Sequence, residues 1–227
     1  SINSGCIYLE ELSISEIQGQ TAVSPYFDLP VTTTGVITGI RSNDIGFYIQ
    51  DNEGPWNGIF VYVGSENDWS FSIGNEVEVT GFVREYFGQT EIEADEISLI
   101  NTFIDLPLSS NITTGELNES YEGVLVKFTN SDCVGLTNSE GNWVVDDGTG
   151  QAFIANNVDN YIFDGPYLDY PYDIEGIGDT KLNQYVVHVQ NISINYPGEI
   201  PVAVAVGSPT ADYGDLVELD GSQSYDN

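Results

Sequence analysis

Positive charge is scarce in this sequence. Four lysines and arginines stand against 36 aspartates and glutamates, which gives the 227 residues a formal net charge of -32. A field of this sign repels nucleic acid and anionic membranes, and it costs stability through self-repulsion unless salt or bound cations screen it. Because screening shortens from about 10 Å at 0.1 M salt to about 3 Å at 1 M, we expect a saline or calcium-rich medium outside the cell.

The residues that carry catalysis are also few. There is one histidine, His188, and there are two cysteines, Cys6 and Cys133, with no Cys-x-x-Cys pair, which excludes a zinc site of the usual spacing. No Gly-x-Ser-x-Gly elbow and no Gly-rich phosphate loop with lysine is present. We predict that this segment is not an enzyme. His188 falls in the alternating run YVVHVQNISI, and we expect it on the solvent face of a strand.

Methionine and long apolar runs are absent. The chain begins with serine, so we expect a processed or excised fragment without a signal peptide or a membrane span. In a secreted protein a Cys6 to Cys133 disulfide would tie the N-terminal segment to the second half, and two buried free thiols are the alternative. The predicted location is extracellular or the cell surface.

Helical periodicity is almost absent, and alternating strands with Gly, Asn and Asp turns recur, which predicts an all-β fold. Three pairs of segments align between the two halves, the first two at an offset of 95 residues: 46–54 with 141–150, 77–100 with 172–195 and, after a further shift, 32–40 with 120–128.

Each copy has the pattern of five strands in about 75 residues, the size of a small closed barrel. Gly81 and Gly176, after the fourth strand of each copy, stand where a coiled barrel strand needs to bend. We predict two tandem five-stranded barrels, at 1–100 and 101–196, followed by a linker and further strands at 197–227.

Between residues 12 and 100 the motifs SISEIQG, VTTTGVITGI, GFYIQDNEG, GIFVYV and VEVTGFVREYFGQTEI follow one another in order. Together they resemble the OB-fold modules beside the catalytic domain of large secreted bacterial nucleases. The second copy is similar but lacks the EIQG motif and has a longer middle loop. In those nucleases a different domain carries the chemistry, so the resemblance implies no activity for this segment.

The stretch PVAVAVGSPTADYGDLVELDGSQSYDN at 201–227 contains the patterns Pro-x-Ala-x-Ala and Gly-x-x-Val-x-Leu-Asp-Gly-Ser-x-Ser-x-Asp. It resembles the first strands of a polycystic-kidney-disease (PKD) type Ig-like domain, a spacer and interaction module of secreted and surface proteins. The domain would be incomplete here. Its first strand, with Val202, Val204 and Val206, would leave an apolar edge open to strand addition by a neighbour.

Two kinds of ligand suit the remaining residues. Sugar rings stack on aromatic side chains without bringing negative charge, and Trp56, Trp69 and Trp143 are the candidate platforms; the alternative is that they pin loops or fill the core. Single-stranded nucleic acid needs a basic groove, so direct binding is disfavoured.

Calcium prefers carboxylates and carbonyls of turns, and the equivalent turns of the two copies hold Asp51, Glu53, Asp146 and Asp147. Asp is also an ordinary turn residue. No cofactor is required, and calcium is the ion we predict.

These observations favour a non-catalytic extracellular structural or binding module of a larger secreted or cell-surface protein. Its expected partners are neighbouring domains of the same polypeptide or copies of itself, with carbohydrate as a small ligand. One alternative is an accessory region that captures DNA for a secreted nuclease. Another is a surface fibre subunit that assembles through its C-terminal strands.

Overall fold

The structure, a computed structural model, describes residues 11–41, 45–64, 70–139, 141–155, 166–181 and 184–195. The predicted all-β class is confirmed. Most of the elements are strands, and the described helices are α1 (Ile14–Gln18) and the short 3-10 turns η1 (Thr114–Glu116) and η2 (Glu119–Tyr121). No helix among the described residues is long and apolar enough to cross a membrane.

The first barrel is closed by five strands in the order β1-β2-β3-β5-β4. Strands β3 and β5 pair in parallel and the other neighbours are antiparallel, which is the strand arrangement of an OB-fold. The strands are β1 (Pro30–Ile40), β2 (Gly46–Gln50), β3 (Gly58–Tyr62), β4 (Glu76–Tyr86) and β5 (Gln89–Asn101).

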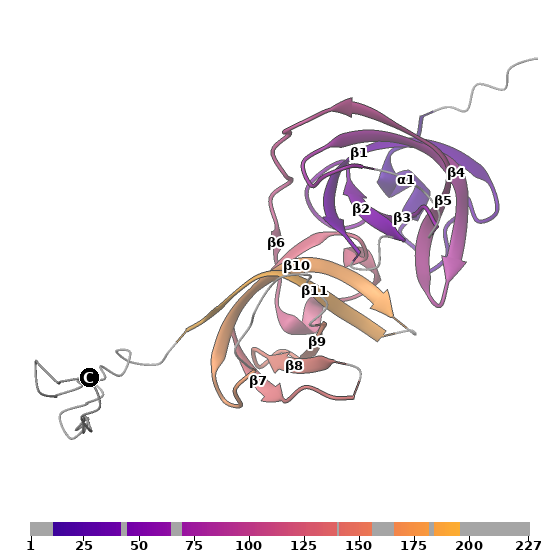
Figure 1. Cartoon of the computed structure of the whole chain (residues 1–227). Helices are drawn as coiled ribbons and strands as arrows, with labels where there is room; N and C mark the ends of the chain where they lie inside the picture. Colours follow the sequence, from indigo (N-terminus) through magenta and orange to yellow (C-terminus); the bar gives the residue numbers. More distant parts are fainter. Residues whose placement is uncertain are drawn as a thin grey trace, which may run out of the picture.

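The second barrel repeats this topology (Figure 1). Strand β9 pairs in parallel with β11, and β10 pairs with β7 to close the ring, while β6 adds to the outer edge of β7. Its strands are β6 (Ser110–Asn111), β7 (Leu125–Gly135), β8 (Asn142–Asp146), β9 (Gln151–Ala155), β10 (Pro171–Lys181) and β11 (Gln184–Ile194). The domain limits given above stay a prediction.

Each barrel has its own apolar core. In the first, Ile14 and Ile17 of α1 are fully buried among inward residues of all five strands. Ser13 and Glu16 form a capping box that begins this helix. In the second, Trp143 and Tyr172 lie at the centre, with ring centroids 5.1 Å apart. Burial of each large apolar side chain contributes about 1.5–3 kcal/mol, so each core can stabilise its own barrel.

The paired glycines each lie at an irregularity of the ladder, inside the fourth strand and not after it. Gly81 opposes Ala94 and Gly176 opposes Val189, each where the ladder shifts register. A Cβ on either glycine would collide with the carbonyl oxygen of the opposite strand. The offset of 95 residues therefore holds for the last two strands of each barrel.

The alignment of the earlier strands was wrong. Inward side chains are Phe47 and Ile49 in β2 but Trp143 and Val145 in β8, so the true offset there is 96 residues. The expected first strand of the second copy, 120–128, also begins too early. Val31 of β1 opposes Gly81, whereas Val126 of β7 opposes Gly176. The apolar run before Val126 misled the alignment because it packs against the first barrel.

Candidate functional site at the junction of the barrels

The outer face of β2 and β3, where OB-folds commonly bind their ligands, is covered in the first barrel. Tyr48 and Phe60 on this face pack against Leu125 of β7 and Ile177 of β10, and all four side chains are at most 3% exposed. Figure 1 shows β10 and β11 turned toward the first barrel. The second barrel therefore takes the place that a ligand would occupy.

Backbones approach closely at this junction. A Cβ on Gly58 of β3 would collide with the carbonyl group of Gly123, so only glycine fits at this position. Two hydrogen bonds cross the junction from the second barrel to the first: the amide of Leu125 donates to Gln50 Oε1 at 3.0 Å, and Gln190 Nε2 of β11 donates to the carbonyl of Thr38 at 2.6 Å. These direct bonds fix the barrels against each other.

Asp179 of β10 is the centre of the polar contacts. Its side chain is 2% exposed, and its Oδ2 lies 2.8 Å from Arg41 Nη2, 2.8 Å from Tyr48 Oη and 2.7 Å from His188 Nε2. Gln89 Nε2 donates to the other oxygen. Three of these four partners come from the first barrel, so one buried carboxylate joins both halves of the chain.

Electrostatics favour the charged form of this carboxylate. Burial alone would raise the pKa of Asp179, but the hydrogen bond from His188 and the charges of His188 and Arg41 outweigh it and hold the pKa below its usual value. Burial opposes the charge of Arg41, yet Tyr48 and Asp179 raise its pKa. The guanidinium also lies 3.9 Å from the ring centre of Phe60, a cation–π contact.

Further carboxyl groups lie beside this cluster. Glu122 is 2% exposed, its Oε1 accepts from the amide of Thr90 at 2.8 Å, and burial raises its pKa well above the usual value. Burial likewise raises the pKa of Glu91 to about 7, and Arg41 lowers it less than burial raises it. The junction therefore holds two carboxyl groups whose pKa values are raised by burial.

Asp179 and His188 form a pair of the kind used by general bases, and the same carboxylate oxygen of Asp179 also accepts from Arg41 and Tyr48. Sequence reasoning missed Arg41, Tyr48, Gln89 and Asp179. It also placed His188 on the solvent face, which was wrong, because only 17% of this side chain is exposed.

The carboxylates predicted to bind calcium have other partners. Asp51 Oδ2 accepts from the amide of Ile14 at 2.8 Å, and Asp147 Oδ2 accepts from the amide of Thr114 at 3.1 Å. Each acceptor follows the second strand of its barrel and caps the short helix before the first strand. Asp146 Oδ1 accepts from the amide of Gly148, and Glu53 is exposed.

Among the described residues no group of three or more His, Cys, Asp or Glu side chains is placed to hold a metal ion. Calcium stays a prediction.

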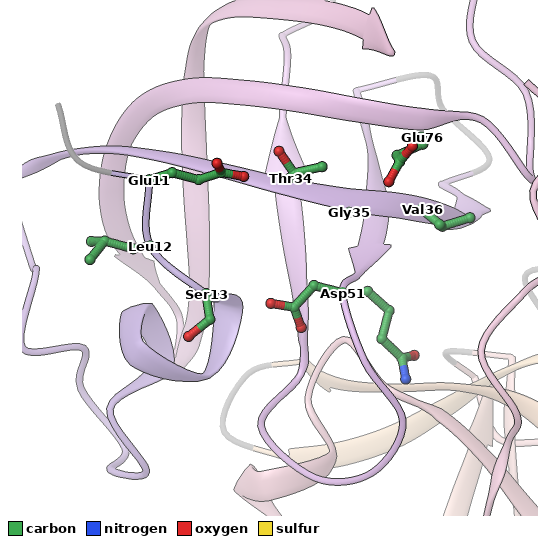
Figure 2. A pocket seen from close by; sticks show the side chains of 9 residues that line it. Glu11, Leu12, Ser13, Thr34, Gly35, Val36, Asp51 and Glu76 are labelled. Atoms are coloured by element: carbon green, nitrogen blue, oxygen red, sulfur yellow. The ribbon is translucent and has the colours of Figure 1, made fainter. Parts of the chain in front are cut away.

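The cap at Asp51 also borders a cavity of about 390 Å³ on the first barrel. Figure 2 shows its wall, with Ser13 at the start of α1 and the carboxylates of Glu11, Asp51 and Glu76 around it. Burial raises the pKa of Asp51, and the bond from the Ile14 amide offsets part of this. A lining with this charge disfavours anionic ligands.

The three tryptophans predicted to be sugar platforms lie in different surroundings. Trp143 is fully buried, so it fills the second core and was wrong as a platform. Trp56 is half-buried, and its amide donates to the carbonyl of Ser120 at 2.6 Å across the junction. Trp69 lies outside the described residues.

Cys133 is buried, and its thiol donates to the carbonyl of Gly135 at 3.6 Å; burial raises its pKa. Its predicted disulfide partner Cys6 lies outside the described residues, so the disulfide stays a prediction. The strand with Val202, Val204 and Val206, and the whole PKD-like stretch, lie outside them as well.

Comparison with known proteins adds little to the strand topology. No family model matches the chain, and no curated protein matches its sequence. A solved structure with some likeness is the crystal structure of the p204 HINb domain, at 12% identity and a TM-score of 0.31, covering 66% of this chain and 85% of that one. This score is too low to carry an argument, so the OB-fold assignment depends on strand order and pairing.

Proposed function

We propose that this chain is a non-catalytic extracellular module in which two OB-fold-like barrels form one stiff unit within a larger secreted or cell-surface protein. Such a unit sets the distance between neighbouring domains and presents a binding surface to its surroundings. The observation that supports it is the junction at Asp179. The usual ligand face of the first barrel is filled by the second barrel, and the chain's lone histidine and one of its four cations are used there.

Capture of DNA by the first barrel has less support. Tyr48 and Phe60, which could stack on bases, are covered, and Arg41 and Arg84 are paired with carboxylates. Neutralising several phosphates needs free cations. Absence of single-stranded DNA binding, with and without calcium, is therefore the expected result.

Stiffness is tested by pulsed electron resonance between spin labels at the exposed positions Asp95 and Ser193, one on each barrel, in a Cys6→Ser background. A narrow distance distribution is expected, and Asp179→Asn should broaden it. A broad distribution in the unsubstituted chain would reject a stiff unit. Hydrolase activity of the purified chain that is lost on substituting one of its own residues would reject a non-catalytic role.

A further inference from the structure

The hairpin between β4 and β5 has an unusual tip. Tyr86 pairs with Gln89, which leaves Phe87 and Gly88 as the two turn residues, with φ of 50° and 90°. Positive φ at both positions is the pattern of a type I′ turn, for which Asn-Gly is the favoured sequence. A bulky residue in this conformation is strained. Turn preference therefore does not account for phenylalanine at position 87.

Core packing does not account for it either. Tyr86 is 59% exposed and Phe87 is 58% exposed, and their rings meet edge to face with centroids 4.7 Å apart and an interplanar angle of 84°. Two neighbouring aromatic rings are thus held at the surface, and the turn would be more stable with another residue in place of Phe87. Strain of this kind concentrates at binding sites.

The base of the hairpin is fixed. Gln89 is 2% exposed and bonds to Asp179 at the junction, while Glu85 Oε1 accepts from the amide of Ser24 at 2.8 Å and from Thr90 Oγ1 at 3.0 Å. These bonds hold the ends of both strands next to the turn. A ligand at the tip therefore meets a preorganised surface and loses little affinity to ordering it.

Charge and size limit what the tip can bind. Arg84, two residues before Tyr86, and Arg41, which contacts Gln89, are already paired with Glu93 and Asp179 at 2.8 Å, so neither is free to receive an anionic ligand. A stable protein interface needs about 800 Å² from each partner, far more than two side chains offer. A sugar ring needs only an aromatic face, whose negative quadrupole attracts its C–H groups.

We propose that Tyr86 and Phe87 form a binding site for neutral carbohydrate at the tip of the β4–β5 hairpin. The inference names a ligand for the binding role in the proposed function and rests on that role. It moves the site away from the predicted tryptophans, one of which is in the core, to an aromatic pair that the topology leaves in solvent next to the rigid junction.

The test is electrophoresis of the full chain in native gels that contain dextran, mixed-linkage β-glucan, xylan or galactomannan, with alginate as an anionic comparison. Retardation by at least one neutral polysaccharide and none by alginate is expected. Phe87→Asn should weaken binding at least tenfold and yet raise the melting temperature, because Asn suits the turn. Tyr86→Ala should weaken binding too.

Phe103→Asn is the matched control, because Phe103 also has a positive φ, of 59°, is 95% exposed and lies beyond the opposite end of β5. It should keep the retardation of the unsubstituted chain. Full retardation of Phe87→Asn, or no retardation of the unsubstituted chain in any neutral gel, would overturn the carbohydrate site. A narrow spin-label distance in that case would leave the stiff unit intact, so the two failures are distinguishable.

Discussion

His188 Nε2 lies 2.7 Å from Asp179 Oδ2, and both side chains extend from neighbouring strands of the second barrel into its contact with the first. An ionised carboxylate only accepts hydrogen bonds, so the imidazole donates. The same oxygen also receives Arg41 and Tyr48 of the first barrel. The pair therefore couples the second sheet to the first barrel.

Asp179→Asn keeps the size of this side chain and removes its charge. Because Arg41 then lacks its partner in a buried place, we expect the free energy of unfolding to fall by about 3–5 kcal/mol. Urea unfolding followed by tryptophan fluorescence measures the change. Asp95→Asn, at an exposed position, is the control and should stay within about 0.5 kcal/mol of the unsubstituted chain. Equal losses in the two variants would contradict the role given to Asp179.

Stability should depend on pH through Glu91. Burial, opposed by Arg41 and assisted by Glu93, Asp179 and Glu85, raises its pKa from 4.5 to about 7. Between these values the folded chain keeps a proton that the unfolded chain releases, so the free energy of unfolding falls as pH rises. Glu91→Gln should flatten this fall in urea midpoints measured from pH 4 to 8.

Asp179 gives the free energy of unfolding the opposite pH dependence, at lower pH. Its lowered folded pKa contributes stability above its unfolded value of 3.8, and this contribution is lost as pH falls through the folded pKa.

Glu96→Gln, at an exposed position of β5, is the control for Glu91→Gln. An unchanged slope between pH 4.5 and 7 in Glu91→Gln would show that this carboxyl does not titrate as described.

The carboxylates of Asp51 and Asp147, which cap two short helices, should contribute similar amounts to the free energy of unfolding. Asp147→Ala removes the acceptor of the Thr114 amide and Asp51→Ala that of the Ile14 amide, so each should lower the free energy of unfolding by about 0.5–2 kcal/mol. Unfolding is measured in EDTA and in calcium chloride at equal ionic strength. Equal losses in both media assign the carboxylates to capping alone, and a larger loss in calcium supports the predicted ion. No loss in either medium contradicts the caps.

Alternation was sufficient to predict the strands, because inward residues of a barrel must be apolar at every second position. It did not settle which face each side chain takes. Tyr48 and Trp143 align as aromatics, yet one faces the junction and the other the core. A slip of one residue exchanges the two faces of a strand. The one-residue difference between the offsets of 95 and 96 therefore places Trp143 in the core, whereas the 95-residue alignment puts it on the face of Tyr48.

The junction could not be predicted because it joins distant segments. Arg41 and Asp179 are 138 residues apart, and a polar residue on the outside of a barrel has the same pattern whether water or another barrel covers it. One signal was available. The run GVLV at 123–126 is more continuously apolar than a barrel strand needs, and its first half packs toward β3. Continuous apolar character before a strand indicates a second surface to cover.

Close packing at Gly58 gives a substitution that opens the junction. In Gly58→Ala the new Cβ would collide with the carbonyl of Gly123, whose backbone cannot move without shifting η2 and β7. We expect the barrels to separate while each core stays folded, which small-angle scattering detects as a larger radius of gyration. Gly54→Asn is the control, because Gly54 has a φ of 87° that Asn accepts and no atom within 4 Å of a Cβ. An unchanged radius in Gly58→Ala would contradict the close contact.

The most direct test of the stiff two-barrel unit is amide ¹⁵N relaxation of the full chain, with rotational correlation times obtained separately for strands β1 to β5 and β7 to β11. Equal times, as expected for one body, would support the account, and Gly58→Ala should make both of them shorter. Two different and shorter times in the unsubstituted chain would show that the barrels tumble independently, which contradicts the junction as the basis of function.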